Sequence, residues 1–178
     1  REALLAGING VLGDHLAATQ NPLAIQPTLR RRNTTAIDAA TPAPVTGKVV
    51  VLAHGLCMND RQWLRKGHDH GAALARDLGY TPLHLHYNSG LHISTNGRIF
   101  ADLLETSGCH YGALAGYRWP GALRKLVFLG TPHHGSPLER SGNWIDIGLG
   151  AFSYTAPLAL VGKLRSAGIT DLRHGSLL

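Results

Sequence analysis

The sequence predicts an α/β fold, in which helices cover a doubly wound and mostly parallel sheet. Three apolar runs predict buried strands, at residues 48–53 (KVVVLA), 80–86 (YTPLHLH) and 123–129 (LRKLVFL). Segments with helical spacing separate these runs. Strands that alternate with helices pair in parallel through right-handed crossovers, so we expect the three runs to belong to one sheet.

Length and composition indicate the class of protein. The 178 residues, of which 44% are hydrophobic and 16% charged, suffice for one globular domain with a buried core. No apolar run approaches the roughly 20 residues that a bilayer-spanning helix needs. The chain shows no signal peptide, so the cytoplasm is the favoured location. Because it begins at Arg1 instead of methionine, we expect a trimmed or partial product.

The formal net charge of +6 would suit acidic partners. Only Arg30, Arg31 and Arg32 form a contiguous basic run, however, and no aromatic residues alternate with them. Nucleic-acid binding requires a broader basic surface, so we expect no nucleic-acid partner. The two cysteines, Cys57 and Cys109, have neither a disulfide framework nor metal-type spacing.

The first 47 residues are predicted to form a helix and a linker that pack on a partial α/β-hydrolase-like domain at 48–178. Residues 2–19 carry one apolar stripe at helical spacing, although Gly7, Gly10 and Gly13 weaken the helix. The stripe suits packing on the core, with contact to a membrane or lipid surface as the alternative. The stripe consists of Leu4, Leu5, Ile8, Val11, Leu12 and Leu16.

Two further helices are predicted between the strands. Asp69 can cap a helix that runs to Leu78 and ends at Gly79. Ser94 or Thr95 can cap a second helix, whose inner face carries Ile99, Phe100, Leu103 and Leu104.

Polar, glycine-containing motifs follow two of the predicted strands. His54-Gly55-Leu56-Cys57 follows the first, and residues 131–136 (TPHHGS) follow the third. Ligands bind at the carboxyl ends of strands in such sheets. Gly55 allows a sharp turn that can aim the backbone N–H of Leu56 at a developing oxyanion, as acyl transfer requires.

Three phrases together resemble bacterial α/β-hydrolases of the lipase and esterase kind, related to glycosylphosphatidylinositol inositol-deacylase-like hydrolases. These phrases are VVVLAHGLCMNDRQW, LHLHYNSGLHISTNGR and LVFLGTPHHGSPLER, within residues 48–140. The resemblance implies that His54 and Gly55 open the oxyanion-hole loop and that Leu56 donates its N–H. It also implies a small-molecule or lipid ester as substrate, bound beside Cys57, His133 and His134, without a cofactor. His133 and His134 can instead hold their loop by bonding the backbone.

The nucleophile of such enzymes has no counterpart in this sequence. No serine has glycines two residues away on both sides, so the G-x-S-x-G elbow is absent. A deletion at about 106–109 would account for the gap. Ser107, Cys109 and His110 do not replace the elbow, because a cysteine and the next residue do not face each other on a helix. Ser136 better suits a local turn.

The acid and base of the resembling enzymes should also come late in the chain. Asp171 and His174 have the right types but lie on one short segment, so they more readily suit a solvated face than a triad. The sequence stops at Leu178 in a stretch that looks internal to the family. Residues 144–160, apolar and aromatic, suit either a lid over an acyl pocket or an ordinary core helix.

Histidine pairs provide an alternative from another class, a metal site. The candidates are His68-Asp69-His70 and His84-Leu85-His86, in which His84 and His86 face one side of a strand. Zinc needs three or four ligands and no further cluster completes either set, so we expect no metal. We therefore predict a serine-hydrolase-type ester hydrolase in its intact form, impaired as this chain stands. The alternative is a non-catalytic remnant that binds an acyl ligand or a partner.

Overall fold

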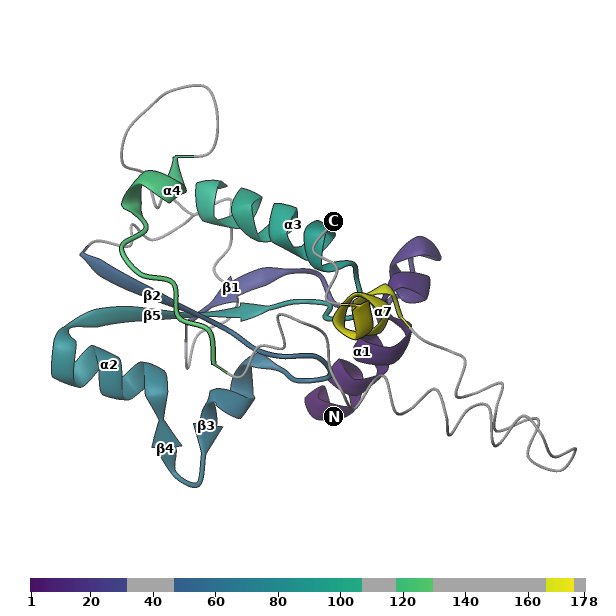
Figure 1. The fold of residues 1–178 in the computed structure, drawn as a ribbon. Helices are drawn as coiled ribbons and strands as arrows, with labels where there is room; N and C mark the ends of the chain where they lie inside the picture. The colour runs from purple at the N-terminus through teal and green to yellow at the C-terminus, as the bar shows by residue number, and fades with distance from the viewer. Residues whose placement is uncertain (32–46, 107–117, 130–165, 175–178) are drawn as a thin grey trace, which may run out of the picture.

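The computed structural model describes residues 1–31, 47–106, 118–129 and 166–174. Figure 1 shows the fold. The described helices are α1 (Glu2–Ala18), the short 3₁₀ helix η1 (Asp60–Trp63), α2 (His70–Leu78), α3 (Ile93–Thr106), α4 (Trp119–Ala122) and α7 (Ala167–His174). The described strands are β1 (Thr28–Arg30), β2 (Lys48–Ala53), β3 (Leu64–Arg65), β4 (His68–Asp69) and β5 (Tyr80–His86).

The main sheet is small and mixed, with strand order β1-β5-β2 in the described part of the chain. β5 pairs in parallel with β2, with Val51 opposite Leu83, and antiparallel with β1, with Leu29 opposite Leu85. The broad α/β class is therefore confirmed. β3 and β4 form a separate two-stranded hairpin.

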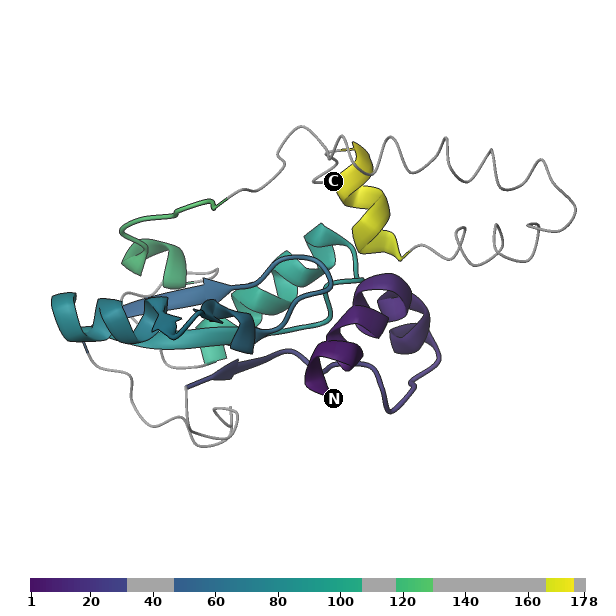
Figure 2. The same cartoon turned by 90° about the horizontal axis from the view of Figure 1, so that it is seen from below.

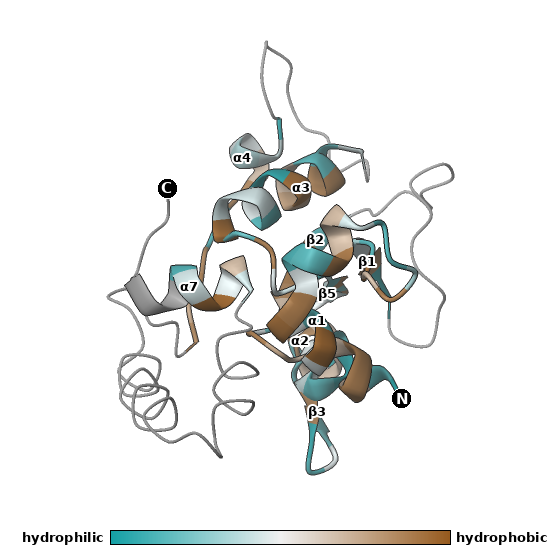
Figure 3. Ribbon diagram, turned by 90° about the vertical axis from the view of Figure 1, so that its right-hand side faces the viewer, coloured by the Kyte–Doolittle hydropathy of each residue, from teal (hydrophilic) through white to brown (hydrophobic). Residues whose placement is uncertain are grey.

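Helices α2 and α3 lie on opposite faces of the three-stranded sheet (Figures 1 and 2). Leu83 and Leu85 of β5 face α3 and join Leu29 and Leu104 in the buried core. Residues alternate between faces along a strand, so Pro82, His84 and His86 lie on the side of α2. Along its length α3 alternates between hydrophilic and hydrophobic residues (Figure 3), as a helix with one apolar face should.

Local signals set the ends of α2 as predicted. The Asp69 carboxylate accepts a hydrogen bond from the Ala72 N–H at 3.1 Å, which satisfies one of the unpaired donors of the first turn. Gly79 ends the helix in the left-handed conformation, at φ 70°, which costs a glycine little.

The start of α3 differs from the prediction. The helix begins at Ile93, so Ser94 and Thr95 lie inside its first turn instead of capping it. The Asp171 carboxylate, from α7, accepts the Ile93 N–H at 2.7 Å. This cap comes from 78 residues away, which explains why no local motif indicated it.

The predicted linker over residues 26–47 is also partly wrong. Thr28–Arg30 is a strand, and Leu29 is only 1% exposed. Three residues are too few to show a period of two. Only their pairing with β5 makes them a strand.

The third predicted strand, Leu123–Leu129, is wrong. The segment has no strand partner in the described residues, and Leu126, Val127 and Leu129 are 67%, 70% and 71% exposed. A β-branched, apolar run becomes a strand only when a neighbouring strand completes its hydrogen bonds. β2 is the outer strand on that side of the described sheet, and it does not pair with this segment.

The N-terminal helix buries the predicted apolar stripe only in part. Leu4 is 70% exposed, whereas the buried residues of α1 are Ala6, Asn9, Gly10, Gly13 and Leu16. Small residues form this face because α1 lies directly against the loops at the carboxyl end of the sheet, next to α7 (Figure 1). The Asn88 side chain donates to the Gly13 carbonyl at 2.8 Å. A Cβ at Gly13 would overlap that side chain.

No described helix is long and apolar enough to cross a membrane.

Substitution of Gly13 and of Gly7 by alanine should change the free energy of unfolding in opposite directions. We expect Gly13→Ala to lower the free energy of unfolding by about 2 kcal/mol, because the new Cβ displaces Asn88. Gly7→Ala should raise it by up to about 1 kcal/mol, because nothing lies within 4 Å of its Cβ position and alanine favours the helix. Urea unfolding of both variants measures this difference. Equal effects would contradict the close contact at Gly13.

Candidate functional site

The candidate site lies where the loops after β2 and β5 meet, at the carboxyl end of the sheet. After β2 the chain makes a tight turn, in which the Met58 N–H donates to the Gly55 carbonyl at 3.2 Å. The Ser89 hydroxyl, from the loop after β5, accepts the Cys57 N–H at 3.1 Å. The structure thus places His54, Gly55, Leu56 and Cys57 at the edge of the sheet where a ligand was expected.

Among the described residues, the turn contains one backbone N–H without a hydrogen-bond acceptor, that of Leu56. Cys57 occupies the third position of the turn at φ 58°, as in type II turns, and its N–H is taken by Ser89. The N–H of Leu56 has no acceptor among the described residues. Leu56 is half-buried, so this donor lies at the margin of the protein instead of in bulk water.

His54 is held rigidly beneath the turn. Its side chain is buried, its Nδ1–H donates to the Gly55 carbonyl at 2.9 Å, and its ring stacks on Tyr87 with centroids 4.3 Å apart. The Tyr87 hydroxyl donates to the His54 carbonyl at 2.5 Å. Tyr87 therefore fixes the residue that precedes the turn, a role that no sequence motif indicated.

Burial controls the protonation of both rings. Desolvation lowers the pKa of His54, an effect that its hydrogen bond to Gly55 opposes. His54 is therefore neutral near pH 7, and its buried Nε2 is an acceptor without a partner in the described structure. Burial also raises the pKa of Tyr87 to about 12, so its hydroxyl stays protonated and keeps donating.

A second polar cluster lies on the α2 side of the sheet. The Asp60 carboxylate accepts from His86 Nδ1 at 3.1 Å and lies 3.6 Å from Arg30 Nη1. Desolvation acts to raise the pKa of Asp60, but the hydrogen bond and charge of His86, together with the charge of Arg30, lower it to about 2. Asp60 remains ionised at all ordinary pH values.

This cluster answers two questions that the sequence left open. His86, one of the two histidines in the His84-Leu85-His86 candidate, is hydrogen-bonded to the Asp60 carboxylate. Arg30, part of the basic run, is engaged with Asp60 on the sheet. In the described part of the chain no group of three or more His, Cys, Asp and Glu residues could hold a metal ion. His68 and His70 instead meet as rings, edge to face at 4.7 Å.

Asp171 pairs with His92, which directly precedes α3, and the side chain of His174 lies outside the described residues. Its two carboxylate oxygens are 3.1 and 3.2 Å from His92 Nδ1. The Asp171 side chain is 8% exposed and that of His92 57%. His92 was not singled out from the sequence, because the two residues are 79 positions apart.

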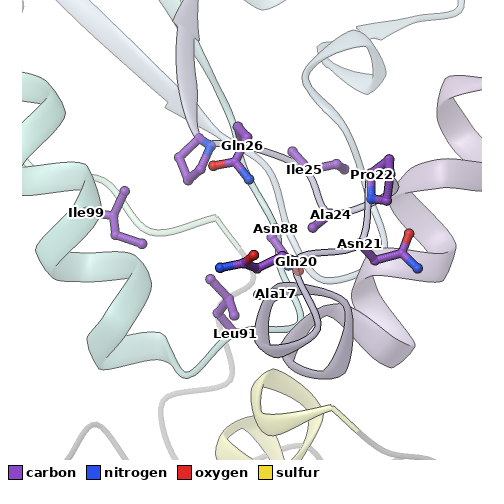
Figure 4. A pocket seen from close by; sticks show the side chains of 11 residues that line it. Ala17, Gln20, Asn21, Pro22, Ala24, Ile25, Gln26, Asn88, Leu91 and Ile99 are labelled. Atoms are coloured by element: carbon purple, nitrogen blue, oxygen red, sulfur yellow. The ribbon is translucent and has the colours of Figure 1, made fainter.

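A pocket of about 510 Å³ lies between residues 20–27, the end of α1 and α3 (Figure 4). Leu91 and Ile99 line one side, and the carboxamides of Gln20, Asn21 and Gln26 line the other. Every residue that lines it is uncharged. The pocket therefore suits a neutral or apolar group better than an ion.

Several candidates lie outside the described residues. These are Ser107, Cys109, His110, His133, His134, Ser136 and the segment 144–160, and also Arg32 and the side chain of His174. Comparison of the chain with protein-family models, with curated proteins and with solved structures gives no match.

The Asp60 cluster predicts a pH-dependent stability. Because the pKa of Asp60 falls from 3.8 to about 2 on folding, its stabilisation is complete above pH 3.8 and is lost as the pH falls through about 2. Asp60→Asn should therefore lower the free energy of unfolding by about 2 kcal/mol at pH 5.5 and by much less at pH 2. Urea unfolding at several pH values measures this.

Asp77→Asn is the matched control, because Asp77 pairs with Arg76 on the exposed surface of α2. Its effect should be small at every pH. A pH-independent cost at Asp60 would show that packing, and not charge, holds the cluster together.

Tyr87→Phe tests how the turn is held. It removes the donor to the His54 carbonyl but keeps the ring stack, so we expect the free energy of unfolding to fall by about 1–2 kcal/mol. Tyr80→Phe, in the first position of β5, serves as the comparison and should cost less than 0.5 kcal/mol or so. Thermal unfolding of both variants gives the result, and an equal cost would contradict the anchoring role.

Proposed function

We propose that this chain follows the doubly wound α/β-hydrolase plan and that the turn at 55–58 binds the carbonyl oxygen of a carboxylic ester. The observation that carries the proposal is the Leu56 N–H, which is uncommitted at the carboxyl end of β2 while its neighbour Cys57 is engaged. A fixed backbone donor at such an edge is what stabilises an oxyanion during acyl transfer.

Three further features support an uncharged ester as the ligand. The turn is fixed from two sides, by Ser89 and by Tyr87, so its donor is held in place before a ligand arrives. The pocket that Asn88 and Leu91 of the loop after β5 help to line is uncharged and includes Ile99, which suits an acyl or alkyl chain. The motif HGLC also follows directly after a strand, as the oxyanion-hole loop of lipases and esterases does.

The serine mechanism of such enzymes is not expected from these 178 residues, because they contain no G-x-S-x-G elbow. The chain would then bind an ester without forming a serine-linked acyl intermediate. The second candidate function is therefore binding, without hydrolysis through a serine. The exposed apolar segment at 123–129 favours this candidate, because it offers a surface for a protein partner.

Ester binding at the turn can be observed directly. When ethyl butyrate is titrated into the labelled chain, we expect the ¹⁵N–¹H resonance of Leu56 to shift and that of Gly67, in the distant β3–β4 hairpin, to stay in place. Leu56→Pro removes the donor and should abolish the response of the neighbouring Cys57 amide, whereas Leu56→Ala should keep it. A shift at Gly67 but none at Leu56 in the unmodified chain would refute the proposed site.

A fluorophosphonate probe tests the missing nucleophile. Such probes phosphonylate an activated serine, so the intact mass of this chain should stay unchanged after incubation, while a serine esterase treated in parallel gains the phosphonyl group. Labelling at any one serine would show that the chain has an activated serine outside the elbow motif.

A further inference from the structure

We propose that His92, oriented by Asp171, is a general base that activates water for attack on a bound ester. The inference rests on the proposed ester site, and it supplies a catalytic base that the sequence did not reveal. It starts from the pairing of an exposed imidazole with a buried carboxylate, which joins α7 to the residue directly before α3.

The geometry fixes which nitrogen of His92 can act. Both oxygens of Asp171 lie within 3.2 Å of Nδ1, so Nδ1 carries the proton and donates it to the carboxylate. Nε2 then holds the lone pair of the neutral ring, on a side chain that is 57% exposed. A carboxylate that sets the tautomer in this way is the arrangement that makes a histidine an effective base.

Asp171 is itself held in place. It also accepts the Ile93 N–H at 2.7 Å, and its helix α7 is fixed by the Gly168 N–H, which donates to the Gly90 carbonyl at 3.0 Å. On α1, Asp14 accepts the Ala167 N–H at 3.0 Å and is the other acidic group at the start of α7. With its N–H donors in place, the buried Asp171 remains an acceptor and acts as a positioning residue.

The pair and the proposed ester site share one loop. Ser89 accepts the Cys57 N–H through its hydroxyl, and its carbonyl lies against Gly168, one helical turn before Asp171. His92 follows Ser89 by three residues. The His92 residue and the Leu56 turn therefore both belong to the loops at the carboxyl end of the sheet.

The reaction balances without any further reagent. His92 Nε2 takes a proton from water as the water oxygen bonds to the ester carbonyl carbon, and the carbonyl electron pair moves to the oxygen that faces the Leu56 N–H. The tetrahedral intermediate then expels the alkoxide as the bond between its carbon and the alkoxide oxygen breaks. The His92 imidazolium gives its proton to the alkoxide oxygen. The products are a carboxylic acid and an alcohol, and Asp171 takes no proton from His92 in any step.

The test is hydrolysis of p-nitrophenyl acetate by the full 178-residue chain between pH 5 and 9. We expect a rate above that of buffer that rises with one ionisation and is slower in D₂O. His92→Gln should lower kcat/KM about a hundredfold. His68→Gln, an exposed histidine in the β3–β4 hairpin, is the matched control and should leave the rate unchanged.

Asp171→Asn separates positioning from folding. The asparagine oxygen can still accept the Ile93 N–H, so the structural cap survives, but the side chain no longer stabilises the imidazolium. We expect the rate to fall and its pH profile to shift while the unfolding temperature changes little, and Asp171→Glu to recover part of the rate. A stability loss without any change in the pH profile would show that Asp171 only caps α3 and would overturn the proposal.

The two proposals fail separately. If ethyl butyrate shifts the Leu56 amide but His92→Gln hydrolyses p-nitrophenyl acetate as fast as the unmodified chain, the base is wrong and the ester site stands. If hydrolysis depends on His92 but the Leu56 amide does not respond, the base is supported and the ester site is wrong. A rate equal to that of buffer overturns the role of His92.

Discussion

The close contact between α1 and the loop after β5 is the constraint on which the candidate site depends. Gly13 has no side chain, so Asn88 can reach its carbonyl and α1 can lie directly on the loop. Asn88 in turn accepts the Gly90 N–H and positions Ser89, which fixes Cys57. A larger residue at Gly13 would move each of these groups. The arrangement of the turn is therefore a consequence of one missing Cβ.

One face of β5 is apolar and the other is polar. Leu83 and Leu85 supply the apolar core with α3, and their burial supplies most of the hydrophobic stabilisation that so small a sheet can have. On the other face, His86 and Asp60 satisfy each other, so a polar residue can be buried there without loss of a hydrogen bond. The cluster holds η1, the segment directly after the turn, against the sheet. The charged cluster on the α2 side of the sheet thus supports the candidate site at the carboxyl end of the sheet.

The features that could be predicted from the sequence are those that adjacent residues determine. The β2 and β5 strands, the cap at Asp69 and the end at Gly79 are each specified by a few adjacent residues, and each was confirmed. The failures all involve distant partners. Leu123–Leu129 has the composition of a strand but no strand partner among the described residues, and the buried face of α1 includes small residues that its leucine spacing did not indicate. At the site, the turn could be predicted from HGLC, whereas His92 and Asp171 meet only through the fold.

The outer edge of β2 and the exposed apolar segment at 123–129 have a common physical basis. Within the described residues, β2 pairs with one strand only, and the side chains of Leu126, Val127 and Leu129 are exposed to solvent. One additional strand between them would satisfy both. The turn that contains Leu56 is held independently of that edge, through the pairing of β2 with β5 and the hydrogen bonds of Ser89 and Tyr87.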